Sequence, residues 1–308
     1  WSCCGIDRGQ GYIKAQRVTL NFGGGLCFDW KNNFSYVEIC HYDDLGQQIL
    51  NSFCILPHSG SARKISLEDP RVTVRGDSII VTAFKWWIEE SNPDRDKLVY
   101  SSKLWTYEFD LDFMPLRDYE IEFRGNVSGH IEKNWVPFCG EKEWFLYSLD
   151  PVVLVSHESR IVTKVLESDA ELKWPHGPVH NSSNLINVAS NKWVGFFHGS
   201  LPISQADAGL QYPAKYSTSL YSLELNQQKI LTLRFLETPL FTDVSMIPHY
   251  PGSANFLGIF GIFKFTNDLI GLCCATDSVG FFMTVSIRDL MLALDAPEAR
   301  VLTCDSNN

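Results

Sequence analysis

The stretch Asn191-Lys192-Trp193-Val194-Gly195-Phe196-Phe197-His198 shows the pattern that decides the fold. A polar pair opens a short apolar run rich in aromatic and β-branched residues, which predicts a turn followed by a β-strand. The same pattern occurs elsewhere in the chain: Lys31–Asn33 before 34–40, Gly76-Asp77 before 78–87, Gly140–Lys142 before 143–148, and Asn267-Asp268 before 269–275.

The five units indicate an all-β repeat architecture of small sheets, because they follow one another at spacings of roughly 45–75 residues. We expect a five-bladed β-propeller, since radial packing of sheets hides most strand edges. A pair of β-sandwiches is the alternative. Only Ile287 to Leu294 reads as a helix, and no linker or low-complexity stretch divides the 308 residues. The sequence therefore predicts one domain over residues 1–308.

Composition and charge exclude some classes of partner. The net charge of −10 disfavours a nucleic acid or an anionic membrane surface, because both need a basic face on the protein. No apolar run approaches the roughly 18 residues of a membrane span. Hydrophobic residues make up 45% of the chain, enough for a sizeable core, and its nine Trp suit flat, half-apolar ligands such as sugar rings.

The cysteines bear on the cellular compartment. There are nine, an odd number, without metal-ligand or CxxC spacing, which favours free thiols and a cytoplasmic protein. Three acceptor sequons, at Asn33, Asn126 and Asn181, and a first residue other than Met leave a secretory lumen as the alternative.

The segment Leu67-Glu68-Asp69-Pro70-Arg71-Val72 is the first candidate functional site. A carboxyl group that donates a proton needs a fixed position and a tuned pKa. Pro70 stiffens the backbone directly after Asp69, and Arg71 offers a fork of donors for an oxyanion or a phosphate. The alternative is an Asx-type turn with a surface ion pair.

The second candidate is Ile131-Glu132-Lys133-Asn134-Trp135-Val136-Pro137-Phe138, with Tyr147-Ser148-Leu149-Asp150-Pro151 after the next strand. Charged side chains beside aromatic ones suit a sugar, whose hydroxyls need polar partners and whose ring has an apolar face. The alternative is a loop that leads into a blade, with Trp135 and Phe138 in the core.

These motifs carry a family resemblance when they are taken in order. Glu-Asp-Pro-Arg at 68–71 and Glu-Lys-Asn-Trp-x-Pro-Phe at 132–138 are followed by Tyr-Ser-x-Asp-Pro at 147–151, Gly-Phe-Phe-His-Gly at 195–199 and Ala-Thr-Asp at 275–277. The chain resembles glycoside hydrolase family 130, the inverting β-mannoside phosphorylases, and the related trypanosomatid mannosyltransferase/phosphorylases. The likeness spans roughly residues 20–290 and implies a five-bladed propeller, no metal and a site in the central channel.

The resemblance implies a role for individual residues. Asp69 matches the general acid, which acts through a sugar hydroxyl, and His198 and Tyr216 match the phosphate pocket. The residues expected to bind substrate are Glu68, Arg71, Lys133, Asn134, Trp135, Asp150 and Asp277, and those expected to bind phosphate are Arg71, Lys133, His180, His198 and Tyr216. Simpler readings are a core histidine for His198 and a turn cap for Asp277.

The chain departs from the family pattern in three places. Asn21–Gly25 replaces an early Asn-Pro-Ser-type loop, Cys40-His41 replaces an arginine, and Trp174–His180 replaces a basic, glycine-rich segment. A phosphate dianion needs several fixed cations, and histidine is a poorer permanent cation than lysine or arginine. The family likeness is thus better supported than phosphate as the acceptor.

The expected function is inverting transfer of a β-linked sugar, with mannose as the expected sugar. An oligosaccharide or sugar phosphate would be the substrate and inorganic phosphate the co-substrate, without a cofactor. Within the enzymes, the alternatives are an inverting hydrolase with Glu132 as base and a nucleotide-sugar transferase. A non-catalytic carbohydrate-binding propeller is the alternative from another class.

Overall fold

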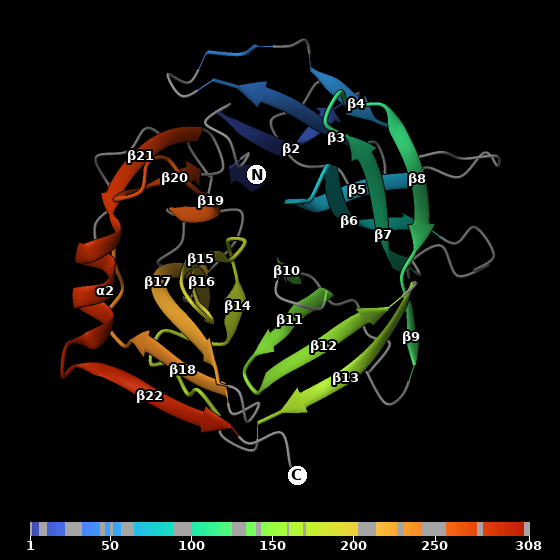
Figure 1. The fold of residues 1–308 in the computed structure, drawn as a ribbon. Helices are drawn as coiled ribbons and strands as arrows, with labels where there is room; N and C mark the ends of the chain where they lie inside the picture. Colours follow the sequence, from blue (N-terminus) through green and yellow to red (C-terminus); the bar gives the residue numbers. More distant parts are fainter. Residues whose placement is uncertain are drawn as a thin grey trace.

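The strands in the described part of the chain form five sheets around a common centre, a five-bladed β-propeller, so the predicted fold is confirmed (Figure 1). The computed structural model describes residues 2–5, 11–21, 33–43, 47–49, 52–56, 65–88, 100–124, 134–139, 143–158, 160–168, 171–202, 214–226, 231–241, 257–275 and 280–304.

Each blade is one sheet, numbered here along the chain. Blade 1 contains β1 (Ser2–Gly5), β2 (Tyr12–Asn21), β3 (Asn33–Tyr42) and β4 (Phe53–Ile55). Blade 2 contains β5 (Ile65–Arg75), β6 (Ser78–Ile88), β7 (Tyr100–Asp110) and β8 (Pro115–Glu120). Blade 3 contains β10 (Val136–Cys139), β11 (Glu143–Leu149), β12 (Val152–Glu158), β13 (Ile161–Glu167) and β9 (Glu122–Arg124).

The last two blades share the C-terminal part of the chain. Blade 4 contains β14 (Val179–Asn181), β15 (Ile186–Ala189), β16 (Lys192–Pro202), β17 (Ala214–Leu225), β18 (Leu231–Leu236) and β22 (Ala299–Cys304). Blade 5 contains β19 (Gly258–Lys264), β20 (Leu269–Ala275) and β21 (Gly280–Ser286), and α2 (Ile287–Asp295) leads from it to β22. The ring closes because β1 contacts both β5 and β19.

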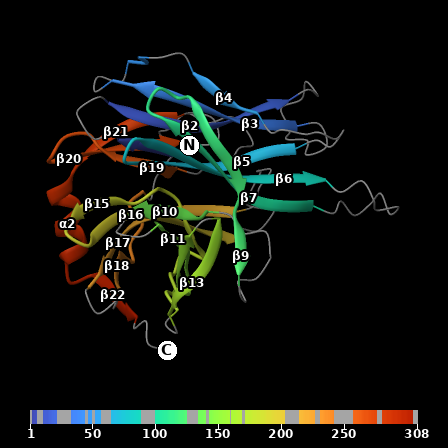
Figure 2. The same cartoon turned by 45° about the vertical axis from the view of Figure 1, so that its right-hand side comes forward.

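β9 and β22 each pair with a blade to which the preceding strand along the chain does not belong. β8 runs almost directly into β9, which pairs in parallel with β13 at the outer edge of blade 3 (Figure 2). β22 follows blade 5 along the chain but pairs with β18 of blade 4. Both strands cover an outer sheet edge that would otherwise be open to pairing with another chain.

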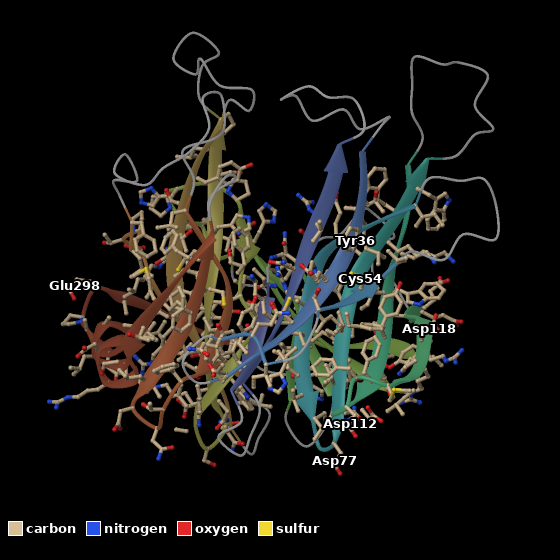
Figure 3. The ribbon with its side chains drawn as sticks, turned by 90° about the horizontal axis from the view of Figure 1, so that it is seen from above. Tyr36, Cys54, Asp77, Asp112, Asp118 and Glu298 are labelled. Carbon is tan, nitrogen blue, oxygen red and sulfur yellow. The ribbon has the colours of Figure 1, made fainter. Side chains whose placement is uncertain are left out.

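Three of the five predicted turns, at 76–77, 191–192 and 267–268, lie among the described residues and lead into strands, whereas 31–32 and 140–142 lie outside the described residues. Gly76-Asp77 connects β5 to β6, and Asn191 precedes β16. Gly76 has a φ of 55° and Asn191 a φ of 57°, the left-handed region that glycine and asparagine tolerate best. Asp77 and Asp112, in the turns that end two hairpins of blade 2, lie at the same end of the ring (Figure 3).

Apolar side chains fill the space between neighbouring blades, with one cluster at each of the five junctions. Ile39 and Val81 belong to the cluster between blades 1 and 2, and Phe145 to the one between blades 2 and 3. Phe197 packs between blades 3 and 4, and Ile259 between blades 4 and 5. A blade with two apolar faces can bury both of them only between two neighbours, so the closed ring is the stable arrangement.

A smaller aromatic cluster closes the junction between blades 5 and 1. The ring of Tyr12 stacks on Phe263 at 4.2 Å and on Tyr42 at 5.1 Å. On the other side of blade 5, α2 buries Leu290 and Leu294, and Ser286 caps it by accepting a hydrogen bond from the backbone N–H of Asp289. With nine residues α2 is too short to cross a membrane. No other helix in the described part of the chain is long and apolar enough to do so.

Candidate active site

Asp69 lies on a β-bulge of β5, the innermost strand of blade 2. The pairing of β5 with β6 shifts register between Glu68 and Arg71, so β5 carries one extra residue there. Asp69 has a φ of 46°, a left-handed conformation that is uncommon outside glycine. Pro70 lacks the N–H that a regular ladder would use. The bulge therefore holds Asp69 in a strained backbone conformation at the inner edge of the sheet.

Glu68 and Arg71 flank the bulge, and both are buried. Glu68 pairs with Arg17 of β2 at 3.2 Å, which links blades 1 and 2. Arg71 donates from Nη2 to the Oδ1 of Asn134 at 3.4 Å, across the junction of blades 2 and 3. Burial lowers the pKa of Arg71 and the charge of Asp69 raises it. A guanidinium group stays protonated at physiological pH, so Arg71 is a permanent cation.

Blade 4 contributes two histidines and a tyrosine. His180 of β14 is the cross-strand partner of His198 of β16, and their ring centres are 5.5 Å apart. The ring of Tyr216 lies 6.2 Å from that of His198. The pKa of His198 is lowered to about 3, first by burial and then by His180 and Arg71, while Asp69 opposes the shift. Arg71 and Asp69 of β5 thus act on His198 of β16 although the two strands belong to different blades.

The structure thus brings together six of the residues that the sequence singled out, from blades 2, 3 and 4. We call them the hub cluster: Asp69, Arg71, Asn134, His180, His198 and Tyr216. The cluster combines a carboxyl group, a permanent cation and several neutral hydrogen-bonding groups. Such a set can donate a proton and hold the oxygens of a polar ligand.

Three other predicted substrate ligands lie outside the hub cluster: Trp135, Asp150 and Glu68, which pairs with Arg17. Trp135 is 4% exposed and packs edge-on against Phe145 and Tyr147 in the core between blades 2 and 3. Asp150, in the turn between β11 and β12, accepts a hydrogen bond from the backbone N–H of Leu172 at 2.9 Å. Protein atoms cover the Trp135 ring, and the Asp150 carboxylate binds a backbone N–H, so neither residue is counted in the hub cluster.

Lys133 and Asp277 lie outside the described residues, and so does Glu132. Their roles as substrate ligands or as a base stay predictions. Asn134, which directly follows Lys133, has a φ of 76° and begins the approach to β10 beside Arg71.

Sequence reasoning missed the buried polar segment Asn181-Ser182-Ser183-Asn184, whose four residues are at most 3% exposed. Asn181 donates to the backbone oxygen of Leu146 at 3.2 Å, so this acceptor sequon is not accessible in the folded protein. Four consecutive polar residues beside an apolar strand were the signal that could have identified this segment.

Tyr221 of β17 was also missed. Its hydroxyl is buried without a hydrogen-bond partner among the described residues, as is the Nε of Arg71. The pKa of Tyr221 is raised by burial, and the positive charge of Arg71 opposes that shift. A buried donor or acceptor without a partner is costly, and Arg71, whose charge acts on Tyr221, also interacts with Asp69.

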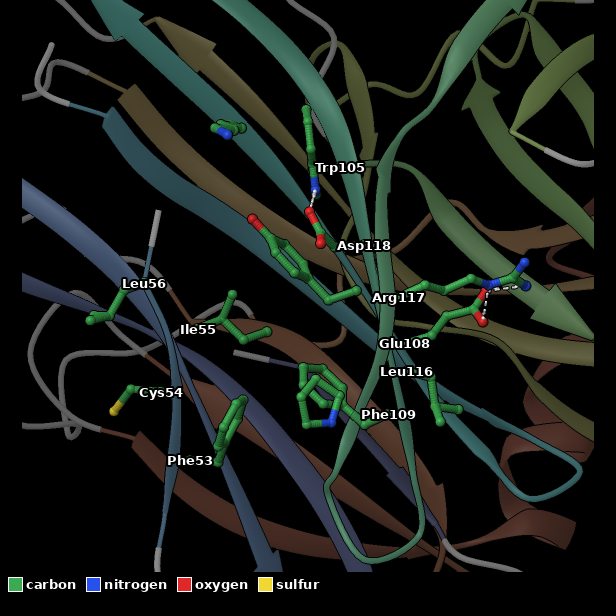
Figure 4. A pocket seen from close by; sticks show the side chains of 13 residues that line it. Phe53, Cys54, Ile55, Leu56, Trp105, Glu108, Phe109, Leu116, Arg117 and Asp118 are labelled. Atoms are coloured by element: carbon green, nitrogen blue, oxygen red, sulfur yellow. Dashed lines mark hydrogen bonds and ion pairs between the residues drawn. The ribbon is translucent and has the colours of Figure 1, made fainter. Parts of the chain in front are cut away.

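A groove of about 680 Å³ lies apart from the hub cluster, on the outer strands β4, β7 and β8 (Figure 4). Trp105 donates to Asp118 at 3.0 Å there, and Arg117 forms a forked ion pair with Glu108 at 2.6 and 2.9 Å. These groups satisfy one another, and none belongs to the hub cluster. In the described part of the chain no three His, Cys, Asp or Glu side chains are grouped so that they could hold a metal ion.

Comparison with known proteins relates the chain to others through its fold. No protein family and no curated protein sequence matches it. Among solved structures it is similar to the β-1,2-mannobiose phosphorylase from Listeria innocua in complex with β-1,2-mannobiose, with a TM-score of 0.57 and 18% identity over 86% of this chain and 70% of that one. It is also similar to a glycosyl hydrolase from Bacteroides ovatus, with a TM-score of 0.59 and 12% identity over 93% of this chain and 83% of that one. At these identities the likeness establishes the fold.

Proposed function

We propose that the protein makes or breaks β-mannosidic bonds by inverting transfer, with Asp69 as the general acid and inorganic phosphate as the co-substrate. The observation that carries the proposal is the hub cluster, in which a strained carboxyl residue on the innermost strand of blade 2 faces Arg71 and His198. The similarity to a mannobiose phosphorylase supports the choice of sugar.

The proposed reaction breaks the bond between the anomeric carbon and the bridging oxygen. Asp69 supplies the proton that the departing oxygen takes up, through a sugar hydroxyl, as the resemblance implies. A phosphate oxygen attacks the anomeric carbon from the opposite face, so a β-mannoside gives α-mannose 1-phosphate. Arg71 contributes a permanent positive charge for the phosphate, and Asn134, His198 and Tyr216 contribute neutral hydrogen bonds.

Hydrolysis is the second candidate, and the state of His198 favours it. With a pKa of about 3, this side chain does not supply a positive charge to a phosphate at neutral pH. Arg71 is then the permanent cation among the described members of the hub cluster, and Lys133 is the proposed second one. In an inverting hydrolase a water replaces the phosphate, and the base must lie roughly 6.5–9.5 Å from the acid.

The decisive experiment incubates the protein with β-1,2-mannobiose and other β-mannosides, with and without phosphate, and measures mannose 1-phosphate and free mannose. Cleavage that requires phosphate supports phosphorolysis, and cleavage without it supports hydrolysis. Binding without cleavage would indicate a carbohydrate-binding propeller and would contradict the proposal.

Asp69→Asn is the matching variant. Losing a general acid typically lowers the rate about 10²–10⁴-fold, so we expect a loss of this size with an unchanged melting temperature. Asp77→Asn is the control, because it makes the same chemical change in an exposed turn of the same blade. Normal turnover by Asp69→Asn would remove Asp69 from the mechanism.

A further inference from the structure

Ser182 lies directly behind His198 and is completely buried. The backbone N–H groups of Ser182 and Ser183 donate to the carbonyl oxygen of Phe196 at 3.0 and 3.2 Å, which fixes this segment against β16. The hydroxyl oxygen of Ser182 lies 2.6 Å from the Nδ1 of His198. The serine therefore occupies one of the two ring nitrogens of a hub-cluster residue.

The direction of this hydrogen bond follows from the number of protons and acceptor atoms on the imidazole and the hydroxyl. A neutral imidazole carries one N–H and has one acceptor nitrogen. The Ser182 hydroxyl has one proton, and within the described part of the chain the His198 Nδ1 is its acceptor. If Nδ1 carried the ring proton, the serine proton would be buried without an acceptor, which is costly. The hydroxyl therefore donates to Nδ1, and the ring proton is on Nε2.

The surroundings of the ring favour the same neutral state. The guanidinium of Arg71 and the ring of His180 both disfavour a second positive charge at this place, and burial acts in the same direction. A neutral N–H donor avoids the repulsion by Arg71 that an imidazolium would feel. The two basic side chains can then bind one ligand without opposing each other.

We infer that Ser182 is a positioning residue that holds His198 as the neutral Nε2–H tautomer, so that the ring carries its proton on Nε2 and acts as neither a cation nor a base. The ligand class, a sugar hydroxyl or a phosphate oxygen, rests on the proposed function. The assignment of the His198 tautomer does not depend on the proposed function. The inference leaves proton exchange with the substrate to Asp69 and gives His198 a role in recognition.

The test is the nitrogen chemical shifts of the His198 ring in the intact protein labelled with ¹⁵N-histidine, with the signal assigned by its loss in His198→Gln. We expect a protonated Nε2 and an unprotonated, hydrogen-bonded Nδ1, unchanged between pH 8 and pH 5. A protonated Nδ1, or protonation with a midpoint near the ordinary histidine pKa of about 6.5, would overturn the inference.

Ser182→Ala should let His198 populate both tautomers, which the same spectrum reports. Ser222→Ala is the matched control, since Ser222 is an equally buried serine of blade 4 that pairs with Val194 and Arg234. Where β-mannoside turnover is measurable, we expect Ser182→Ala to lower kcat by about tenfold, as on losing a group that orients a functional histidine. An unchanged tautomer in Ser182→Ala contradicts the inference even if turnover falls. A protein without turnover contradicts the proposed function and leaves the spectral result valid.

Discussion

Arg71 and His198 are both basic side chains of the hub cluster, yet burial acts on them with different results. The pKa of a guanidinium starts so high that the lowering by burial leaves it charged, and Asp69 supports that charge. The imidazole starts near neutrality, and burial together with Arg71 lowers its pKa to about 3. One residue of the hub cluster is therefore a cation and the other a neutral hydrogen-bonding group.

The depressed pKa of His198 predicts how the stability of the protein depends on pH. The folded state binds this proton less readily than the unfolded chain, whose histidine has a pKa of about 6.5. The contribution of the neutral imidazole to the free energy of unfolding is therefore fully present above about pH 6.5. It is lost as the pH falls toward the folded-state pKa of about 3. Below pH 6.5, wild type should lose up to about 1.4 kcal/mol per pH unit more than His198→Gln does.

Urea unfolding of both proteins at several pH values between 7 and 4.5 measures this difference. If the free energy of unfolding fell equally with pH in wild type and in His198→Gln, the imidazole would have the same pKa in the folded and unfolded states.

At this scale the sequence predicted which residue types to examine but not all of their surroundings. The motif around Asp69 was visible, because a proline and an arginine beside an acid form a local pattern. The bulge was not visible, since it depends on the register of β5 against β6. For Trp135 the sequence allowed a core position or a sugar contact, and only the packing of blades 2 and 3 places its ring in the core.

Among the elements, the segment 181–184 connects blade 4 to both of its neighbours. Asn181 donates to Leu146 of blade 3. Asn184 both donates to and accepts from the backbone of Ile262 in blade 5, at 2.8 Å each. Backbone groups of a strand in one blade are thereby satisfied by a side chain from a neighbouring blade.

Asn184→Leu should lower the free energy of unfolding by about 2–4 kcal/mol, because two hydrogen bonds are lost and the N–H and C=O of Ile262 stay buried without partners. Asn187→Leu is the control, an exposed asparagine of β15 whose change should stay within about 0.5 kcal/mol. Chemical denaturation of the two variants measures both values. If Asn184→Leu lowered the free energy of unfolding as little as Asn187→Leu, the Asn184 contacts would not hold blades 4 and 5 together.

The elements also show where local patterns stop being informative. A turn pair followed by an apolar run predicts a hairpin, because both signals lie within a few residues. The pairing of β9 with blade 3 and of β22 with blade 4 depends on partners far away in the sequence. The polar run at 181–184 could have been noticed in the sequence, but its contacts with Leu146 and Ile262 depend on the packing of neighbouring blades.

For the whole molecule, polar contacts accompany the apolar clusters at four of the junctions between consecutive blades. They are Arg17–Glu68 between blades 1 and 2, Arg71–Asn134 between blades 2 and 3, Asn181–Leu146 between blades 3 and 4, and Asn184–Ile262 between blades 4 and 5. Apolar packing alone permits small shifts of one sheet against another, whereas hydrogen bonds require a particular position. These contacts fix the blades near the site and so hold the hub cluster in place.

The closed ring is also what brings Asp69 and His198 together, since they lie in blades that are not neighbours along the chain. The central claim is that this meeting point is the place where a saccharide binds. A crystal structure of the protein grown with mannose and phosphate tests it most directly. The account predicts a sugar with a hydroxyl within roughly 2.6–3.2 Å of the Asp69 carboxylate and a phosphate or sugar oxygen bound by Arg71 and His198. A saccharide bound only in the outer groove of Figure 4, with no ligand at the hub cluster, would contradict it.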